Sequence, residues 1–194
     1  MKKKVAAVGL GLMGGSMAKT IKARTLSRVL GWNRTRATAE QALADGSIDA
    51  IATEALYKEA DLVIIGLYPQ ATVDWLLENM SKMKKGCVIV DMVGVKQFMV
   101  DHLEQAALDA GVHYVGGHPM AGTQYSGFGH ARANLYHNAP MVIVPPDFDN
   151  IELLSHVKEL LSPAGFGSFS VTTADSHDEM IAFTSQMAHL VSNA

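Results

Sequence analysis

The feature of this sequence that most constrains its fold is a set of three spaced glycines near the N-terminus. Gly9, Gly11 and Gly14 form a GxGxxG pattern between an apolar run at residues 4–8 and a helical pattern at residues 13–24. In such a strand–turn–helix unit, the first glycine permits the tight turn, the second lets the backbone approach a pyrophosphate, and the third lets helix and strand pack closely. The helix N-terminus then offers free N–H groups to phosphates. The pattern predicts a dinucleotide site formed by Gly9, Gly11, Leu12, Met13 and Gly14.

Short apolar runs alternate with helical patterns along the rest of the chain. Several of the runs are apolar on both faces, as expected of strands covered by helices on both sides. This alternation predicts an α/β fold, a Rossmann-type doubly wound and mostly parallel sheet within residues 1–172. The segment 122–138 has no clear periodicity and is expected to be a functional or mobile loop. The expected strands are residues 4–8, 29–32, 62–67, 87–92, 112–115, 141–144 and 167–171, and the expected helices are 13–24, 36–44, 71–80, 97–110 and 151–161.

Residues 173–194 form a separate helical pattern. Ser176 and Glu179 have the spacing of a capping box, and no helix-ending signal follows before Ala194. At 100° per residue, Met180, Ile181, Thr184, Met187, Ala188 and Val191 share one face, and Asp178, Ala182, Ser185 and His189 form a narrow stripe on another. We therefore expect the first helix of an all-helical second domain, which the chain does not complete.

Composition excludes several classes of protein. The formal net charge is −3, and no basic block follows Lys2-Lys3-Lys4, so nucleic acid and anionic membrane surfaces are not expected partners. A single cysteine, Cys87, rules out an internal disulfide and fits the cytoplasm. No apolar stretch reaches the roughly 20 residues of a transmembrane helix. No ligand cluster predicts a metal site.

The end of the second predicted strand indicates which dinucleotide binds. An NAD enzyme commonly has Asp or Glu where Asn33 stands, because a carboxylate binds the ribose hydroxyls and repels a 2′-phosphate. Asn33 lacks that charge, Arg34 can pair with the phosphate, and Thr35 and Arg36 can add donors. These residues favour NADP, while an NAD site beside a solvent-facing Arg34 stays open.

A histidine follows the predicted strand at residues 112–115. His118 lies in the run GGHP, at the edge of the sheet where ligands of such folds bind. Its ordinary pKa suits it to accept a proton from a hydroxyl as hydride leaves the same carbon. Position alone leaves a catalytic and a structural role open.

Several motifs occur together in the order of one known family. They are GLGLMGGS at 9–16, DxxGVK at 91–96, GGHPMAGT at 116–123 followed by Ser126-Gly127, Asp175-Ser176-His177-Asp178, and Ser185-Gln186-x-x-His189. Together they resemble the prephenate dehydrogenase family of tyrosine biosynthesis, and the likeness spans nearly the whole chain.

The resemblance implies oxidative decarboxylation of prephenate to 4-hydroxyphenylpyruvate, or of arogenate to tyrosine, with NADP or NAD. His118 would accept the ring hydroxyl's proton, and Thr123, Gln124, Ser185 and His189 would contact the substrate. It also implies a homodimer formed through the C-terminal helical region. His177 is expected to be a packed or capping residue, and for Asp178 a capping role and a ligand contact both stay open.

The sequence departs from the family pattern at two positions and in its length. Gly94 stands where many members carry a serine, and Gln124 where some carry a glutamate. Members continue into a helical domain that supplies an arginine for a substrate carboxylate. We therefore expect a truncated chain that binds NADP and turns over prephenate poorly or not at all.

Two other classes of function stay open. One is an NADP-dependent β-hydroxyacid dehydrogenase or imine reductase, which shares the Asn-Arg-Thr signature but lacks GGHPMAG. The other is a non-catalytic module that senses NADP(H) and passes its state to a partner.

Overall fold

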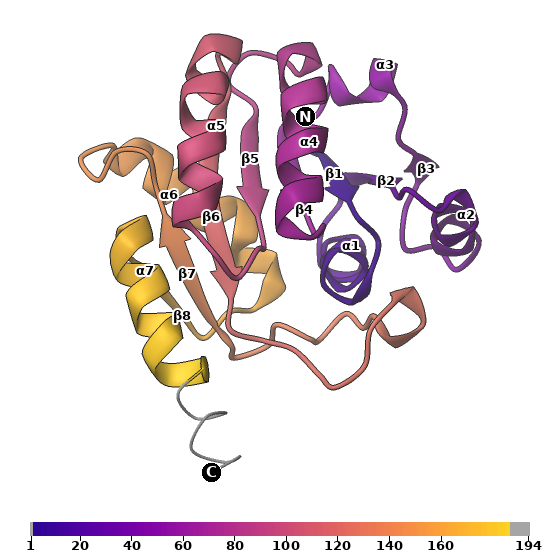
Figure 1. Cartoon of the computed structure of the whole chain (residues 1–194). Helices are drawn as coiled ribbons and strands as arrows, with labels where there is room; N and C mark the ends of the chain where they lie inside the picture. Colours follow the sequence, from indigo (N-terminus) through magenta and orange to yellow (C-terminus); the bar gives the residue numbers. More distant parts are fainter. Residues whose placement is uncertain (1, 187–194) are drawn as a thin grey trace.

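The computed structural model describes residues 2–186 and contains an eight-stranded sheet with helices on both faces (Figure 1). The strand order is β3-β2-β1-β4-β5-β6-β7-β8, and all neighbours are parallel except β6 and β7. This confirms the predicted doubly wound, mostly parallel sheet. The strands are β1 (Lys4–Val8), β2 (Arg28–Trp32), β3 (Ala50–Ile51), β4 (Leu62–Ile65), β5 (Val88–Asp91), β6 (His113–Pro119), β7 (Pro140–Val144) and β8 (Ser168–Val171).

Two hydrophobic cores lie on opposite faces of the sheet. Successive side chains of β1 alternate between them: Val5 and Ala7 enter one core, and Ala6 and Val8 the other. The first core is covered by α1 (Leu12–Arg24), α2 (Arg36–Ala44) and α6 (Ile151–Leu161). The second is covered by α3 (Glu54–Tyr57), α4 (Pro69–Asn79) and α5 (Gln97–Ala110). Burial on both faces explains why the central strands are continuously apolar.

Several expected boundaries differ from the structure by one to four residues, and two short elements were not expected. Strand β6 continues four residues past the predicted end at residue 115, because Gly116 to Pro119 pair antiparallel with β7. The run at residues 62–67 is a strand only over Leu62–Ile65. Strand β3 and helix α3 were not predicted, because they are two and four residues long and too short to show a periodicity.

The long connection between β6 and β7 is anchored on α1. The Tyr136 hydroxyl donates to the carbonyl of Met13 (2.6 Å), and the Ser16 hydroxyl accepts from the N–H of Arg132 (3.0 Å). The ring of Tyr136 is fully buried. In Figure 1 this connection runs below the carboxyl ends of the strands toward the start of α1. The segment 122–138, predicted as a loop, therefore lies at the edge of the sheet where ligands bind.

Helix α7 (Ala174–Ile181) follows β8 and packs against α5. Its cap is Thr173, whose hydroxyl accepts from the N–H of Ser176 (3.2 Å), so the expected capping box of Ser176 and Glu179 is wrong. A π-helix (Ala182–Gln186) continues the chain, and His189 lies outside the described residues. None of the helices within residues 2–186 has the length and apolar character needed to cross a membrane.

Candidate active site

The three glycines of the β1–α1 loop have different surroundings. Gly9 adopts φ +84°, which favours glycine, and a Cβ on Gly14 would lie 2.1 Å from the carbonyl oxygen of Gly9. A Cβ on Gly11 would meet nothing within 4 Å. The fold itself therefore requires glycine at residues 9 and 14, whereas residue 11 faces open space. Asn33 Oδ1 accepts from the N–H of Leu10 (2.9 Å), which ties this loop to the end of β2.

Two adjoining cavities open beside this loop, at the point between β1 and β4 where the strand order reverses. The cavity next to β2, here the β2 cavity, has a volume of about 470 Å³. The cavity next to β5, here the β5 cavity, has a volume of about 540 Å³. Both are lined by Gly11, Gly66, Leu67 and Tyr68. Together they form one crevice that extends to both sides of the glycine loop.

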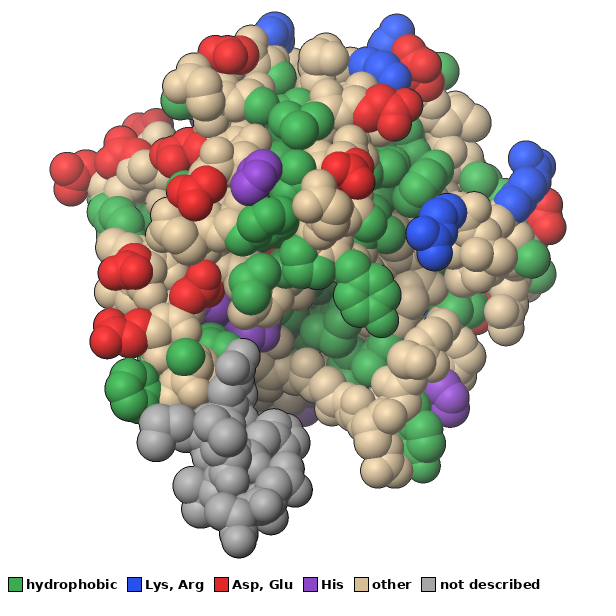
Figure 2. All heavy atoms as spheres, viewed as in Figure 1, with side chains coloured by type: hydrophobic (Ala, Val, Ile, Leu, Met, Phe, Trp, Pro, Cys, Tyr) green, Lys and Arg blue, Asp and Glu red, His purple; other side chains and the backbone are tan. Residues whose placement is uncertain are grey.

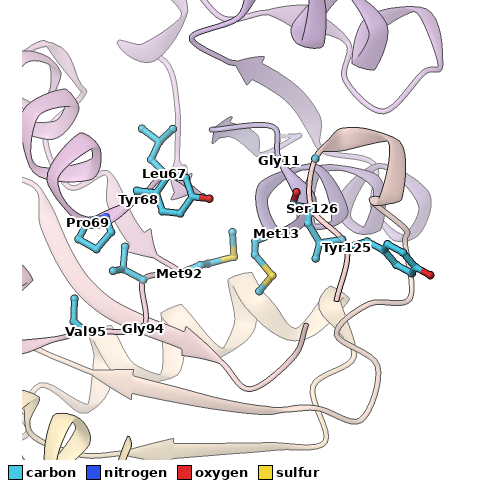
Figure 3. A pocket seen from close by; sticks show the side chains of 14 residues that line it. Gly11, Met13, Leu67, Tyr68, Pro69, Met92, Gly94, Val95, Tyr125 and Ser126 are labelled. Atoms are coloured by element: carbon cyan, nitrogen blue, oxygen red, sulfur yellow. The ribbon is translucent and has the colours of Figure 1, made fainter. Parts of the chain in front are cut away.

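The β5 cavity is bounded by four segments (Figure 3). The start of α1 contributes Met13, the segment after β4 contributes Tyr68, the segment after β5 contributes Met92 and Gly94, and the β6–β7 connection contributes Tyr125. In Figure 2 this region is a hollow with hydrophobic side chains on its floor. A largely apolar cavity with few polar groups is typical of a small-molecule site.

The β2 cavity contains the residues predicted to select the dinucleotide. Asn33, Arg34 and Thr35 line it, as do Asp74 and Glu78 of α4, which the sequence analysis did not find. Arg34 and Thr35 are exposed, and no carboxylate stands at residue 33. Arg36, expected to add a donor, instead pairs with Glu40 (2.8 Å) and does not line the cavity.

His118 is half-buried near the end of β6, between the β5 cavity and a shallow hollow lined by residues 118–123. A Cβ on Gly94, which lines the β5 cavity, would lie 3.6 Å from both Cε1 and Nε2 of His118. The Nε2 edge of the ring therefore lies beside Gly94, at the border of that cavity. Burial of the imidazole lowers the pKa of His118 to about 4, and interactions with His177 and with the Lys96 ammonium add to this effect. At neutral pH the ring is uncharged and can accept a proton.

The other nitrogen of His118 contacts α7. Its Nδ1 lies 2.8 Å from Nε2 of His177, and Nδ1 of His177 lies 2.7 Å from Oδ1 of Asp178. His177 is 1% exposed. Asp178 also accepts from the backbone N–H groups of Lys96 (2.8 Å) and Gln97 (2.9 Å), so it caps the start of α5 rather than its own helix. Sequence reasoning missed the contact of His177 with His118, for which the adjacent His-Asp pair was the only signal.

A buried ion pair supports the segment that carries Gly94. Lys96 and Asp91 are both fully buried, and the Lys96 ammonium contacts Asp91 Oδ1. The same carboxylate accepts from the Tyr114 hydroxyl (2.6 Å) and from the N–H of Val93 (2.8 Å). These contacts hold both ends of the turn at residues 92–96 beside His118.

The remaining predicted substrate residues are less closely grouped. Thr123 lines the hollow beside His118, and its hydroxyl makes only local contacts with the backbone of Tyr125. Gln124 is exposed and lines neither the β2 nor the β5 cavity. Ser185 lies in the π-helix, and the expected contact from His189 falls outside the described residues.

The fold, the glycine loop and the adjoining cavities define a nucleotide-binding domain of the Rossmann class. Comparison with known proteins identifies the family: residues 17–168 match the model for the nucleotide-binding domain of prephenate dehydrogenase. The chain belongs to the prephenate dehydrogenase family.

Individual relatives agree with this assignment. The chain is 32% identical to the prephenate dehydrogenase of Bacillus subtilis (strain 168), over 98% of this chain and 52% of the relative. The solved structure of Synechocystis arogenate dehydrogenase superposes with a TM-score of 0.84 at 28% identity, covering 94% of this chain and 64% of that one. A prephenate dehydrogenase from A. aeolicus, solved with hydroxyphenyl propionate and NAD+, shares the fold at a TM-score of 0.85 and 24% identity, over 98% of this chain and 67% of that one. The chain thus spans about half the length of the curated relatives it matches.

Proposed function

We propose that this chain forms the cofactor-binding half of an NAD(P)-dependent dehydrogenase that oxidatively decarboxylates prephenate or arogenate. The observation that carries the proposal is the placement of His118, whose Nε2 edge lies beside Gly94 of the β5 cavity while Nδ1 contacts His177. The names of the relatives, a prephenate and an arogenate dehydrogenase, support both substrates. Membership in this family favours the reaction over a β-hydroxyacid dehydrogenase or an imine reductase.

The residues around the two cavities fit a dinucleotide. Gly11 leaves open space where a pyrophosphate needs close access to the backbone, and the N-terminus of α1 offers free N–H groups there. The β2 cavity would take the adenosine half and the β5 cavity the nicotinamide half. When bound, the nicotinamide supplies the acceptor for a hydride.

The proposed roles of the protein groups follow from their positions. His118 accepts the proton of the substrate's ring hydroxyl at Nε2, and its low pKa keeps that site free at neutral pH. Gly94 leaves room for the hydroxyl beside the imidazole. Thr123, Gln124, Ser185 and His189 are proposed to contact the rest of the substrate. Residues 173 onward are proposed to begin a second, helical domain that forms a homodimer.

The test of the reaction combines turnover with cofactor binding. Reduced cofactor is followed by its absorbance with prephenate, arogenate and a hydroxyacid as substrates. His118→Asn should lower turnover by about 10²- to 10⁴-fold, the usual contribution of a general base, and leave cofactor affinity within about twofold. Turnover of the hydroxyacid alone would contradict the proposal. Intact cofactor binding without turnover of any substrate, both by this chain and by a full-length version that includes the helical domain, would favour the NADP(H)-sensing alternative.

We also propose that the cofactor is NADP rather than NAD. Asn33 uses its side-chain oxygen to hold Leu10 and brings no negative charge, while the exposed Arg34 can pair with a 2′-phosphate. Asp74 and Glu78 line the same cavity, and their negative charges would repel that phosphate. The proposed preference for NADP therefore depends on Arg34.

Arg34→Ala should therefore weaken NADP binding by about 10- to 100-fold, as expected for loss of a charge-assisted hydrogen bond, and change NAD binding by less than about threefold. Arg36→Ala is the matched control, because Arg36 pairs with Glu40 and does not line the cavity. Equal affinities of the unaltered chain for the two cofactors would refute the preference.

A further inference from the structure

Three side chains form a continuous row from the border of the β5 cavity, beside Gly94, to the start of α5. The row runs from His118 on β6 through His177 to Asp178 on α7, with contacts of 2.8 Å and 2.7 Å between ring nitrogens and carboxylate. The two histidine rings meet edge to face, with centroids 5.1 Å apart. Residues 59 positions apart in the sequence are thus brought into direct contact.

The proton positions in this row follow from the inventory of donors and acceptors. An ionised carboxylate can only accept, so Nδ1 of His177 must donate to Asp178. A neutral His177 then has an unprotonated Nε2, which accepts from Nδ1 of His118. The remaining nitrogen of His118, Nε2, is left with its lone pair free, and this is the nitrogen that lies beside Gly94, a residue that lines the β5 cavity.

Asp178 is held in its ionised form by its own contacts. Burial alone would raise the pKa of Asp178, but the N–H groups of Gln97 and Lys96 and the ring of His177 hold that pKa below its ordinary value. The start of α5, with its free N–H groups and positive dipole end, thereby fixes the charge at the far end of the row.

We propose that His177 and Asp178 are positioning residues, which fix His118 in the tautomer that presents an unprotonated Nε2 to the substrate. The inference deepens the proposed function, in which His118 is the base. Neither residue touches the substrate in this role. They act through the imidazole of His118, because the hydrogen bond at Nδ1 sets the orientation of the ring and decides which nitrogen carries the proton.

The opposite tautomer, in which Nε2 of His118 carries the proton and Nδ1 accepts from Nε2 of His177, is disfavoured by the surrounding charges. It would need His177 protonated at both nitrogens, which places a cation in a site that is 1% exposed. A cationic His177 would lie beside His118, where Lys96 is already a positive charge; both of these groups lower the pKa of His118, and Asp91 and Asp178 are the negative charges that raise it. Asp91 is paired with Lys96, so Asp178 alone would have to compensate the second cation.

The test reads the tautomer directly, by long-range proton–nitrogen NMR on the chain labelled with ¹⁵N in its eight histidines. The signals of His118 are assigned by their loss in His118→Gln. In the unaltered chain at pH 7, Nδ1 should carry the proton and Nε2 should be bare. In His177→Phe, which keeps an aromatic ring in the buried site but removes the acceptor, a large fraction of His118 should carry the proton on Nε2.

His177→Gln is the conservative control, because its amide oxygen can still accept from Nδ1 of His118, and it should keep the original tautomer. A protonated Nε2 in the unaltered chain would overturn the proposal, even if both variants fail to fold. An unchanged tautomer in a folded His177→Phe would also overturn it. This readout needs neither substrate nor cofactor, so it is independent of whether the proposed reaction takes place.

Discussion

The absence of a side chain at residue 94 decides how much space remains beside the imidazole of His118. A Cβ at this position would meet Cε1 and Nε2 of His118 at 3.6 Å, an ordinary van der Waals distance, and residue 94 is exposed. The contrast with Gly14, where a Cβ would lie 2.1 Å from a backbone oxygen, is large. The fold therefore requires glycine at residue 14 but not at residue 94.

Gly94→Ser should consequently be tolerated, with a change in the free energy of unfolding within about 0.5 kcal/mol. Its hydroxyl would reach the space beside Nε2 and should lower KM for the substrate if it helps to hold the ring hydroxyl. Gly14→Ala should destabilise the chain by at least about 2 kcal/mol, because the contact is with backbone that cannot move aside. Denaturant unfolding of both variants is the measurement, and equal losses would contradict the distinction.

Tyr68 is the one large side chain that lines both cavities while being 84% exposed. An aromatic ring in this place can pack on the cofactor between its two halves. Tyr68→Ala should weaken cofactor binding by about three- to tenfold. Leu77 lies at a half-exposed position of α4, the helix that follows Tyr68, and lines neither cavity, so Leu77→Ala should leave the affinity unchanged. Fluorescence titration with the reduced cofactor compares the two variants.

At the scale of elements, the sequence predicts what is local and misses what depends on pairing. The glycine loop, β1, α5 and α6 are recovered because turn chemistry and periodicity act within one segment. The extension of β6 to Pro119 depends on a partner strand about 25 residues later, and the cap of α5 by Asp178 depends on a helix about 80 residues away. Such contacts cannot be predicted from a pattern within one segment.

The turn between β5 and α5 shows how such a distant network supports the site. Breaking the fully buried pair of Lys96 and Asp91 should cost about 3–5 kcal/mol of stability, because a buried charge is left uncompensated. Lys96→Met should therefore lower Tm by many degrees. Lys96→Met combined with Asp91→Asn should recover part of the loss, since the amide removes the charge, its oxygen can still accept from the N–H of Val93, and its NH₂ group can donate to the Tyr114 hydroxyl. A double variant less stable than Lys96→Met would refute the role of charge.

At the scale of the whole molecule, the site is assembled from segments spread over the chain. Gly11 follows β1, Gly94 follows β5, His118 ends β6 and His177 belongs to α7. The fold class and the position of His118 could be predicted from the sequence, because strand alternation and the motif around residue 118 are local. The row His118–His177–Asp178 could not, because it depends on how α7 packs on α5.

This assembly makes the stability of the chain depend on pH in a definite window. The pKa of His118 is lowered by burial from 6.5 to about 4, so between these values the unfolded chain binds a proton that the folded chain does not. Stability should therefore be fully present above about pH 6.5 and fall as the pH drops toward 4. Asp178, whose pKa is also lowered, loses its contribution only below the ordinary aspartate value of about 3.9.

The free energy of unfolding of the unaltered chain and of His118→Asn, measured between pH 7 and pH 4, isolates this effect. The amide does not titrate, so the difference between the two chains should change by more than 1 kcal/mol across about two pH units if the shift is of the stated size. The groups that act on His118, namely His177, Lys96, Asp91 and Asp178, are the same in both chains and cancel to first order. If the difference in free energy of unfolding stays constant with pH, His118 titrates alike in the folded and unfolded chains. That result would contradict the conclusion that burial lowers the pKa of His118.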